Sequence, residues 1–287
     1  MHYLLVILSN IFLAFDFAIA KRYQADEGTQ LVPSLRFNLF NGLFTAILGL
    51  LLLGFQPGFS LYSLIMAFLM ALCCMSYCVL GFQILRSGNI ASYTLFLMSG
   101  GMLLPYLFGV LFLNEQLTVF RILGVIAILV AVILSGSGQM KLNGKVLLLC
   151  IAVFFLNGGV SIISKCHQVT IAFPTVDSTA FVMYSGIGKC VLSAAVLLMV
   201  RHNSGKFTFT KKSSLPFIAC SALVGGLSYL LQLIGAKELP ATVLYPIVTG
   251  GSIIFSAFSG KIFFKETITR RQWISIGLCL IGTLFFL

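Results

Sequence analysis

The sequence predicts an all-α membrane protein with ten transmembrane helices, arranged as two inverted five-helix repeats. Three observations support this prediction. The 287-residue chain is 59% hydrophobic and only 9% charged, whereas a soluble domain carries about 25% charged residues. Its apolar residues form ten continuous runs, without the alternation typical of a β-barrel. A motif that joins two of these runs occurs twice, 151 positions apart.

The apolar runs have the length of membrane-spanning helices, which need about 20 residues. The first run contains the stretch "YLLVIL", which could be a signal-peptide core, but no small-residue cleavage site precedes the charges that follow. We therefore keep it as the first helix. The short loops between runs leave no room for a separate soluble domain. The predicted helices cover residues 2–20, 31–54, 60–85, 89–113, 117–137, 144–164, 174–200, 213–236, 239–263 and 269–287.

The polar composition excludes several classes of function. We assign the net charge of +11 to loop cations that orient membrane helices, and not to a nucleic-acid surface. The eight cysteines contain no CxxC pair and the three histidines are scattered, so we expect free thiols and no metal. Phosphate-binding glycine loops, nucleophile motifs and paired catalytic carboxylates are absent from the sequence. We expect no cofactor and no enzymatic activity.

The repeated motif lies in "GVLFLNEQLTVFRILG" (residues 109–124) and "GKIFFKETITRRQWIS" (residues 260–275). Each copy has a glycine, an apolar run, a glutamate (Glu115 or Glu266), a threonine three residues later, an arginine and a new apolar run. Thr118 and Thr269 are well placed to cap the next helix. We interpret the motif as structural, with direct contact to a substrate as the alternative.

Small residues accompany both copies of the motif. Gly101, Pro105 and Gly109 recur every four residues, and the same 151-residue shift places Ser252, Ser256 and Gly260 opposite them. The doublets 100–101 and 250–251 begin these stripes. Small residues on one face let two membrane helices approach closely.

Another match joins the ends of the first and sixth runs. "AIAKRYQ" aligns with "IISKCHQ", so that Lys21 corresponds to Lys165 and Gln24 to Gln168. The chain therefore divides into residues 1–140 and 141–287, with the glycine-rich junction "SGSGQMKLNGK" between them. Because five helices is an odd number, the second half must enter the membrane from the opposite side. Inverted repeats of this kind are typical of transporters.

Ten helices, two halves and the motifs "LFLNEQLT" and "IFFKETIT" after glycine-rich fourth and ninth helices resemble the drug/metabolite transporter superfamily, specifically EamA-like transporters. The resemblance covers almost the whole chain. It implies a permease that moves a small metabolite, often an amino acid and commonly outward. It also implies a cavity lined by the first, third, fourth, sixth, eighth and ninth helices, in a bacterial inner membrane.

The chain departs from the superfamily at one position. Its four-helix multidrug members carry a membrane-embedded carboxylate about two turns before the lysine that ends their first helix. Here Leu13 and Asn157 occupy the two corresponding positions, and Asp16 lies within one turn of Leu13. The resemblance therefore assigns no coupling carboxylate.

A charged residue inside a membrane helix is energetically costly, so its presence indicates a functional role. Lys189 lies in the middle of the seventh run, on a face with small residues, where it could bind an anionic or carboxylate group. A buried ion pair with Asp16 or a side chain that extends to the interface remains the alternative. Asp16 could bind substrate or face interfacial water.

Three helices carry polar stripes, which either line a cavity or bond neighbouring helices. The sixth has Asn157, Ser161, Ser164 and Gln168, and the eighth has Gly225, Tyr229, Gln232 and Ala236. The third has Ser76, Tyr77 and Gln83, and Pro246 is expected to interrupt the ninth helix after Tyr245. The predicted substrate-binding residues are Lys189, Asp16, Asn157, Gln83, Tyr77, Tyr229, Gln232 and Tyr245.

Loop cations predict the orientation. Thirteen lysines and arginines lie on the side of the loop between the first two helices, and Arg121, Lys165 and Lys237 lie on the other. The positive-inside rule then places both termini outside the cytoplasm, whereas the resemblance implies termini inside. We prefer the charge count because every loop is short.

These patterns predict a secondary transporter that exports a small polar metabolite, such as an amino acid, by alternating access between the two halves. Its expected partners are that small-molecule substrate and the membrane lipid, and a coupling proton or ion is left open. The alternative is a flippase of a lipid or a lipid-linked sugar, which a lateral opening toward lipid would favour. A membrane enzyme would need a converging nucleophile and base.

Overall fold

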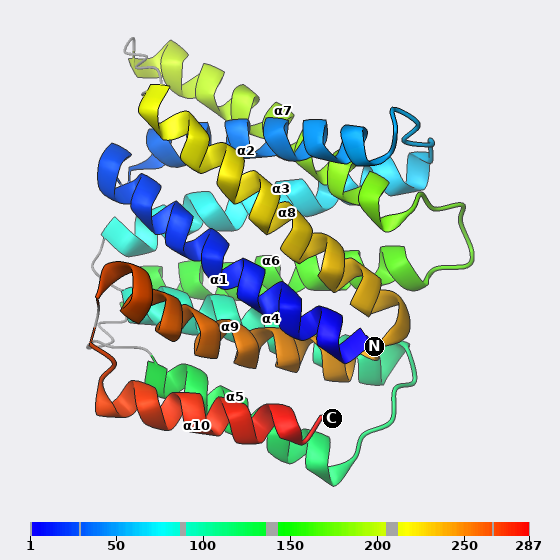
Figure 1. Cartoon of the computed structure of the whole chain (residues 1–287), viewed down its shortest axis with the longest axis vertical. Helices are drawn as coiled ribbons and strands as arrows, with labels where there is room; N and C mark the ends of the chain where they lie inside the picture. Colours follow the sequence, from blue (N-terminus) through cyan, green and yellow to red (C-terminus); the bar gives the residue numbers. More distant parts are fainter. Residues whose placement is uncertain are drawn as a thin grey trace.

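A computed structural model of the chain describes residues 2–28, 30–86, 90–135, 143–204, 212–265 and 267–286. These residues form ten α-helices and one short 3₁₀ helix, with no strand among them, and both termini lie at one end of the bundle (Figure 1). The predicted all-α fold is confirmed. Glu266, most of the glycine-rich junction and the loop cations Lys141, Lys206 and Lys211 lie outside the described residues.

The helices begin and end close to the predicted runs, although α1 and α6 extend further than predicted. In the described ranges, eight helices are long and apolar enough to cross a membrane. The two shorter ones, α5 with 17 residues and α10 with 15, pack against each other. The helices are α1 (His2–Glu27), α2 (Leu31–Leu52), α3 (Leu61–Arg86), α4 (Ile90–Phe112), α5 (Val119–Ser135), α6 (Gly144–Val169), α7 (Ser178–Ser204), α8 (Leu215–Glu238), α9 (Ala241–Phe264) and α10 (Arg270–Leu284).

Helix packing follows the inverted repeat. Helix α2 packs against α7, α4 against α9 and α5 against α10, which are the pairs that join corresponding helices of the two halves. The remaining large contacts come in exchanged pairs: α1 packs on α8 and α9, while α6 packs on α3 and α4. When each helix is replaced by its counterpart in the other half, so that α1 becomes α6, α8 becomes α3 and α9 becomes α4, the contacts of α1 become the contacts of α6.

Two glycines allow a close approach of α2 and α7. A Cβ on Gly42 of α2 would lie 2.6 Å from the carbonyl oxygen of Gly186 on α7, and a Cβ on Gly186 would lie 2.8 Å from that of Gly42. Neither distance is possible for a real side chain. Only glycine lets the two backbones touch, as expected where packing of small residues holds membrane helices together.

Helix α9 is the most enclosed of the long helices. Its residues 241–247 and 249–254 are buried, and Val248 between them is partly exposed. The predicted interruption at Pro246 is wrong, because α9 passes through this proline without a break. A proline six residues into a helix removes one backbone donor, but the packing around α9 keeps the helix continuous.

Candidate functional site

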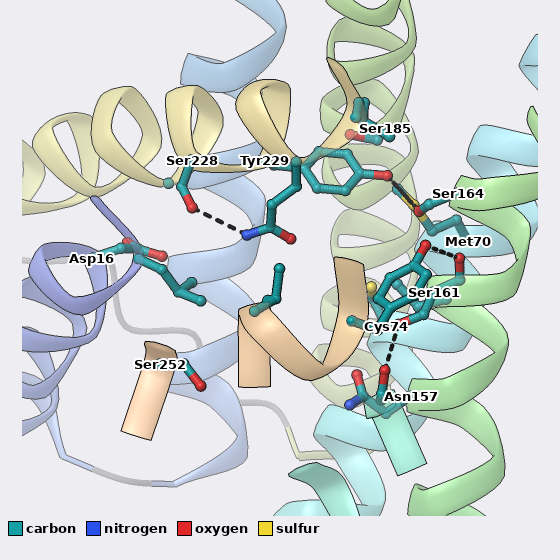
Figure 2. A pocket seen from close by; sticks show the side chains of 18 of the residues that line it. Asp16, Met70, Cys74, Asn157, Ser161, Ser164, Ser185, Ser228, Tyr229 and Ser252 are labelled. Carbon is teal, nitrogen blue, oxygen red and sulfur yellow. Dashed lines mark hydrogen bonds between the residues drawn. The ribbon is translucent and has the colours of Figure 1, made fainter. Parts of the chain in front are cut away.

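A cavity of about 400 Å³ lies among eight of the helices, within the range usual for small-molecule sites. Its lining comes from α1, α2, α3, α4, α6, α7, α8 and α9. The close-up in Figure 2 shows polar side chains converging on it from several directions. Helices α2 and α7 therefore join the six that the family resemblance implied.

Most of the predicted substrate-binding residues lie on this cavity. Gln83 is the exception: it is exposed on α3 and does not line the cavity. Sequence reasoning did not select Asn41, Thr45, Thr249 and Ser252, which also contribute to the lining. The predicted residues that line it are Asp16, Tyr77, Asn157, Lys189, Tyr229, Gln232 and Tyr245.

The polar stripe of α6 both lines the cavity and bonds α4. Asn157 donates from Nδ2 to the carbonyl oxygen of Leu97 at 2.7 Å. Ser161 donates to the carbonyl oxygen of Gly101 at 3.3 Å, which is free because Pro105, four residues later, has no N–H group. The stripe ends at Ser164, since Gln168 instead accepts a hydrogen bond from Ser178 at 2.9 Å.

Two tyrosines cross the cavity wall and join helices within the second half. The hydroxyls of Tyr229 on α8 and Ser164 on α6 lie 2.7 Å apart (Figure 2). Tyr245 on α9 donates to the carbonyl oxygen of Ser161 at 2.5 Å. Each tyrosine buries its ring and satisfies its hydroxyl, as buried tyrosines require.

A third polar line runs along α8. Gln232 donates from Nε2 to the hydroxyl of Ser228 at 3.3 Å (Figure 2). Ser228 in turn donates to the carbonyl oxygen of Ser9 on α1 at 2.8 Å. Within the described ranges, no protein group donates a hydrogen bond to the amide oxygen of Gln232, so this oxygen can accept one from a ligand.

The cavity lining carries one acidic and one basic side chain. Asp16 accepts a hydrogen bond on Oδ1 from Ser221, and Asn41 donates to Ser221 at 3.2 Å. Lys189 lies on α7, next to the contact between Gly42 and Gly186. The predicted alternative of an ion pair between Asp16 and Lys189 is not formed in the described part of the chain, whereas Arg22 pairs with Asp26 and Arg36 with Glu27.

Beyond the cavity, at the end of the bundle that holds both termini, two charged residues clamp the turn between α8 and α9. Lys165 donates to the carbonyl oxygens of Ala236 and Leu239, each at 2.7 Å. Glu115 accepts from the backbone N–H groups of Ala241 and Thr242 at 2.7 and 2.8 Å. Lys165 is only 4% exposed, so its assignment as a loop cation is wrong.

The repeated motif is structural where the structure describes it. Thr118 and Thr269 cap α5 and α10, as predicted: each hydroxyl accepts from the backbone N–H three residues later at 3.3 Å. Thr269 also forms the reciprocal bond with Gln272 that completes a capping box. Glu115 contacts α9 and does not line the cavity.

The cavity wall carries hydroxyl, amide, carboxylate and ammonium groups. Within the described ranges, no group of three or more histidine, cysteine, aspartate or glutamate side chains could hold a metal ion. The eight cysteines carry free thiols. An all-helical membrane bundle with a central polar cavity is typical of transport proteins.

Comparison with known proteins identifies the family. The chain belongs to the EamA-like transporter family, whose model matches residues 144–287, half of the chain. A solved structure described as "Crystal structure of protein" shares the fold, with a TM-score of 0.74 at 14% identity over 97% of this chain and 95% of that one. The resemblance to EamA-like transporters is confirmed.

A curated relative matches over a shorter stretch. The chain is 33% identical over 76 residues to the "Probable 4-amino-4-deoxy-L-arabinose-phosphoundecaprenol flippase subunit ArnE" of Hamiltonella defensa subsp. Acyrthosiphon pisum (strain 5AT). This stretch is 26% of the present chain and spans 66% of the relative's length.

Proposed function

We propose that this transporter exports a small polar metabolite by alternating access between two inverted halves, residues 1–140 and 141–287. The observation that carries the proposal is the 400 Å³ cavity, whose lining comes from helices of both halves. The exchanged packing of α1 with α8 and α9, and of α6 with α3 and α4, supports the division. Two packed halves that rock about a central site can open it to either side in turn.

Within this proposal, the lining residues hold the substrate. Asn157, Tyr229, Gln232 and Tyr245 supply hydrogen-bonding groups, while Asp16 and Lys189 supply charge. Tyr77 adds a further hydroxyl at the wall. We leave Gln83 out because it lies away from the lining.

The test is transport by purified protein in proteoliposomes. Radiolabelled amino acids, sugars and nucleosides are screened first by their effect on melting temperature, because a ligand held by the folded state raises it. Compounds that raise it are then measured for uptake by counterflow. Gln232→Ala should reduce uptake, and the matched control Phe155→Ala, which removes a ring 58% exposed on α6, should leave it unchanged. No counterflow of any compound would contradict the proposal.

A second candidate is flipping of a lipid-linked sugar, and one observation favours it. The curated relative is named as a flippase subunit that acts on a phosphoundecaprenol-linked amino sugar. The two candidates share the inverted halves and the cavity but differ in whether the substrate carries a lipid tail. Translocation of a lipid-linked sugar in liposomes, in the absence of counterflow by water-soluble compounds, would favour the flippase.

The orientation in the membrane stays a proposal. The charge count places both termini outside the cytoplasm, and removing Lys165 from the minority side leaves Arg121 and Lys237 there, which strengthens the bias. A reporter active only in the cytoplasm, fused to the C-terminus, should be inactive. An active reporter would reverse the orientation.

A further inference from the structure

Asp16 and Lys189 are the charged side chains in the described cavity lining. One comes from α1 in the first half and the other from α7 in the second. Both lie in membrane-spanning segments, where an ionised group is costly unless it is paired or solvated. The contacts that hold each side chain indicate which ligand group it can bind.

The carboxylate of Asp16 is fixed on one side only. Ser221 donates to Oδ1 and is itself held by Asn41. The other oxygen, Oδ2, lies 2.8 Å from the place where a Cβ on Gly225 would stand, so the glycine leaves room for it. Within the described residues, Oδ2 has no donor. One lone-pair face of the carboxylate therefore remains for a cationic partner in the cavity.

The Lys189 side chain is positioned by packing close to its backbone and not by contacts of its ammonium group. Its Cβ lies 3.0 Å from the place of a Cβ on Gly42, so the contact between α2 and α7 fixes its stem. In the described part of the chain, its Nζ makes neither a hydrogen bond nor an ion pair, and its side chain is half-buried. An ammonium group with three donors and no protein acceptor is poised for an anion.

The contrast with a second charged pair in the bundle is informative. Arg36, which is 6% exposed, lies with its Nη1 3.9 Å from Glu27 Oε2, so buried opposite charges in this bundle can lie within ion-pair distance. Asp16 and Lys189 share one cavity but are not within ion-pair distance of each other. Two separated, opposite and partly unsatisfied charges form a site with two complementary ends.

From this geometry we propose that the cavity binds a ligand with an ammonium group and an anionic group, the former at Asp16 and the latter at Lys189. A ligand with one charge would leave the other side chain uncompensated, whereas a zwitterion neutralises both. This inference rests on the transport function proposed above. The same chemistry occurs in free amino acids and in lipid headgroups that combine ammonium with phosphate.

The first experiment compares matched charge classes. L-Phenylalanine is tested against N-acetyl-L-phenylalanine, L-phenylalanine methyl ester and the neutral N-acetyl-L-phenylalaninamide, and the same set is repeated on alanine. Glycerophosphoethanolamine represents the lipid headgroup. We expect a zwitterion to raise the melting temperature most, and the single-charge and neutral members of its set to bind at least about tenfold more weakly. A soluble amino acid as the preferred ligand indicates a metabolite, and glycerophosphoethanolamine indicates a lipid headgroup.

The second experiment is a double-mutant cycle with Asp16→Asn and Lys189→Gln. Without ligand, the two effects on melting temperature should be only weakly coupled, because the two charges interact across the cavity but form no direct ion pair. With the zwitterion, each single variant should lose most of the response, and the double variant should lose little more. Asp16→Glu and Lys189→Arg, which keep the charges, serve as folded controls that retain part of the response.

The outcomes separate the two proposals. Equal or stronger binding of neutral or singly charged compounds, or no response to any zwitterion, overturns the two-charge site. If such compounds are nevertheless transported in proteoliposomes, the transport function stands. Coupling of the two substitutions in the absence of ligand that is as strong as their coupling in its presence would identify a structural ion pair and would also overturn the inference.

Discussion

Lys165 and Lys21 stand at corresponding positions of the two halves, but they differ in burial and in the contacts that the described residues show. Lys165 is buried and donates to two carbonyl oxygens of the α8–α9 turn. Lys21 is exposed, with its Nζ 4.6 Å from the centre of the Phe264 ring. The same residue type thus clamps one end and lies on the surface at the other.

This difference shows that repeated sequence does not enforce identical contacts. An inverted-repeat transporter that is open to one side must break its symmetry, because the contacts closing one end are those released at the other. Lys165 and Glu115 together make polar contacts from both halves to the α8–α9 turn. Substitutions at corresponding positions can measure how far the asymmetry extends.

The largest expected effect comes from Lys165→Ala compared with Lys21→Ala. Loss of Lys165 leaves two buried carbonyls without their donor, which should lower the free energy of unfolding by about 2 kcal/mol. Lys21 is exposed, so loss of its contacts, the one with the Phe264 ring among them, should cost less, about 0.5–1 kcal/mol. Melting in detergent, followed with a thiol-reactive dye on the native cysteines, measures both. Equal losses would mean that the two ends are equally secured.

A smaller effect is expected from Glu115→Gln. The carboxylate caps the first turn of α9 with charge-assisted hydrogen bonds, and a neutral amide should cost about 1 kcal/mol. Glu238→Gln is the matched control, because Glu238 is exposed at the end of α8 and caps no helix. If both variants melt alike, the clamp at the α9 N-terminus contributes little.

The smallest effect concerns the two copies of the repeated motif. Thr269→Ala removes a complete capping box, and Thr118→Ala removes a cap whose single bond is 3.3 Å long. We expect losses of about 1 kcal/mol and about 0.5 kcal/mol, respectively. Urea or thermal unfolding of the two variants measures both losses. A larger loss at Thr118 would show that the first copy carries more of the stability.

Hydropathy was sufficient for the helices, because only apolar runs of about 20 residues satisfy a bilayer. The rotation of each helix about its own axis, which decides the face that meets the cavity, was harder to predict. In lipid both the packed face and the exposed face of a helix are apolar, so periodicity is informative only where several polar residues recur. The stripes at Asn157 and Tyr229 met this condition. Asn41 and Thr45, four residues apart on α2, carried the same signal in a weaker form and were missed.

The errors have related physical causes. Gln83 was selected as a polar residue within an apolar run, but it lies near the end of α3, where an exposed amide is tolerated. Lys165 was read as a loop cation because it lies close to the end of the predicted sixth helix. The helix continues to Val169, which carries the lysine inside the bundle to a neighbouring helix end that no local pattern reveals.

The contact of Gly42 with Gly186 has a mechanical consequence. It is a touching point of two backbones beside Lys189 and Asn41, and it lies away from the ends of α2 and α7. For a rigid body turning about a fulcrum, displacement grows with distance from it. Under the alternating access proposed above, a tilt centred there would move the two ends of the bundle much further than the cavity residues beside it.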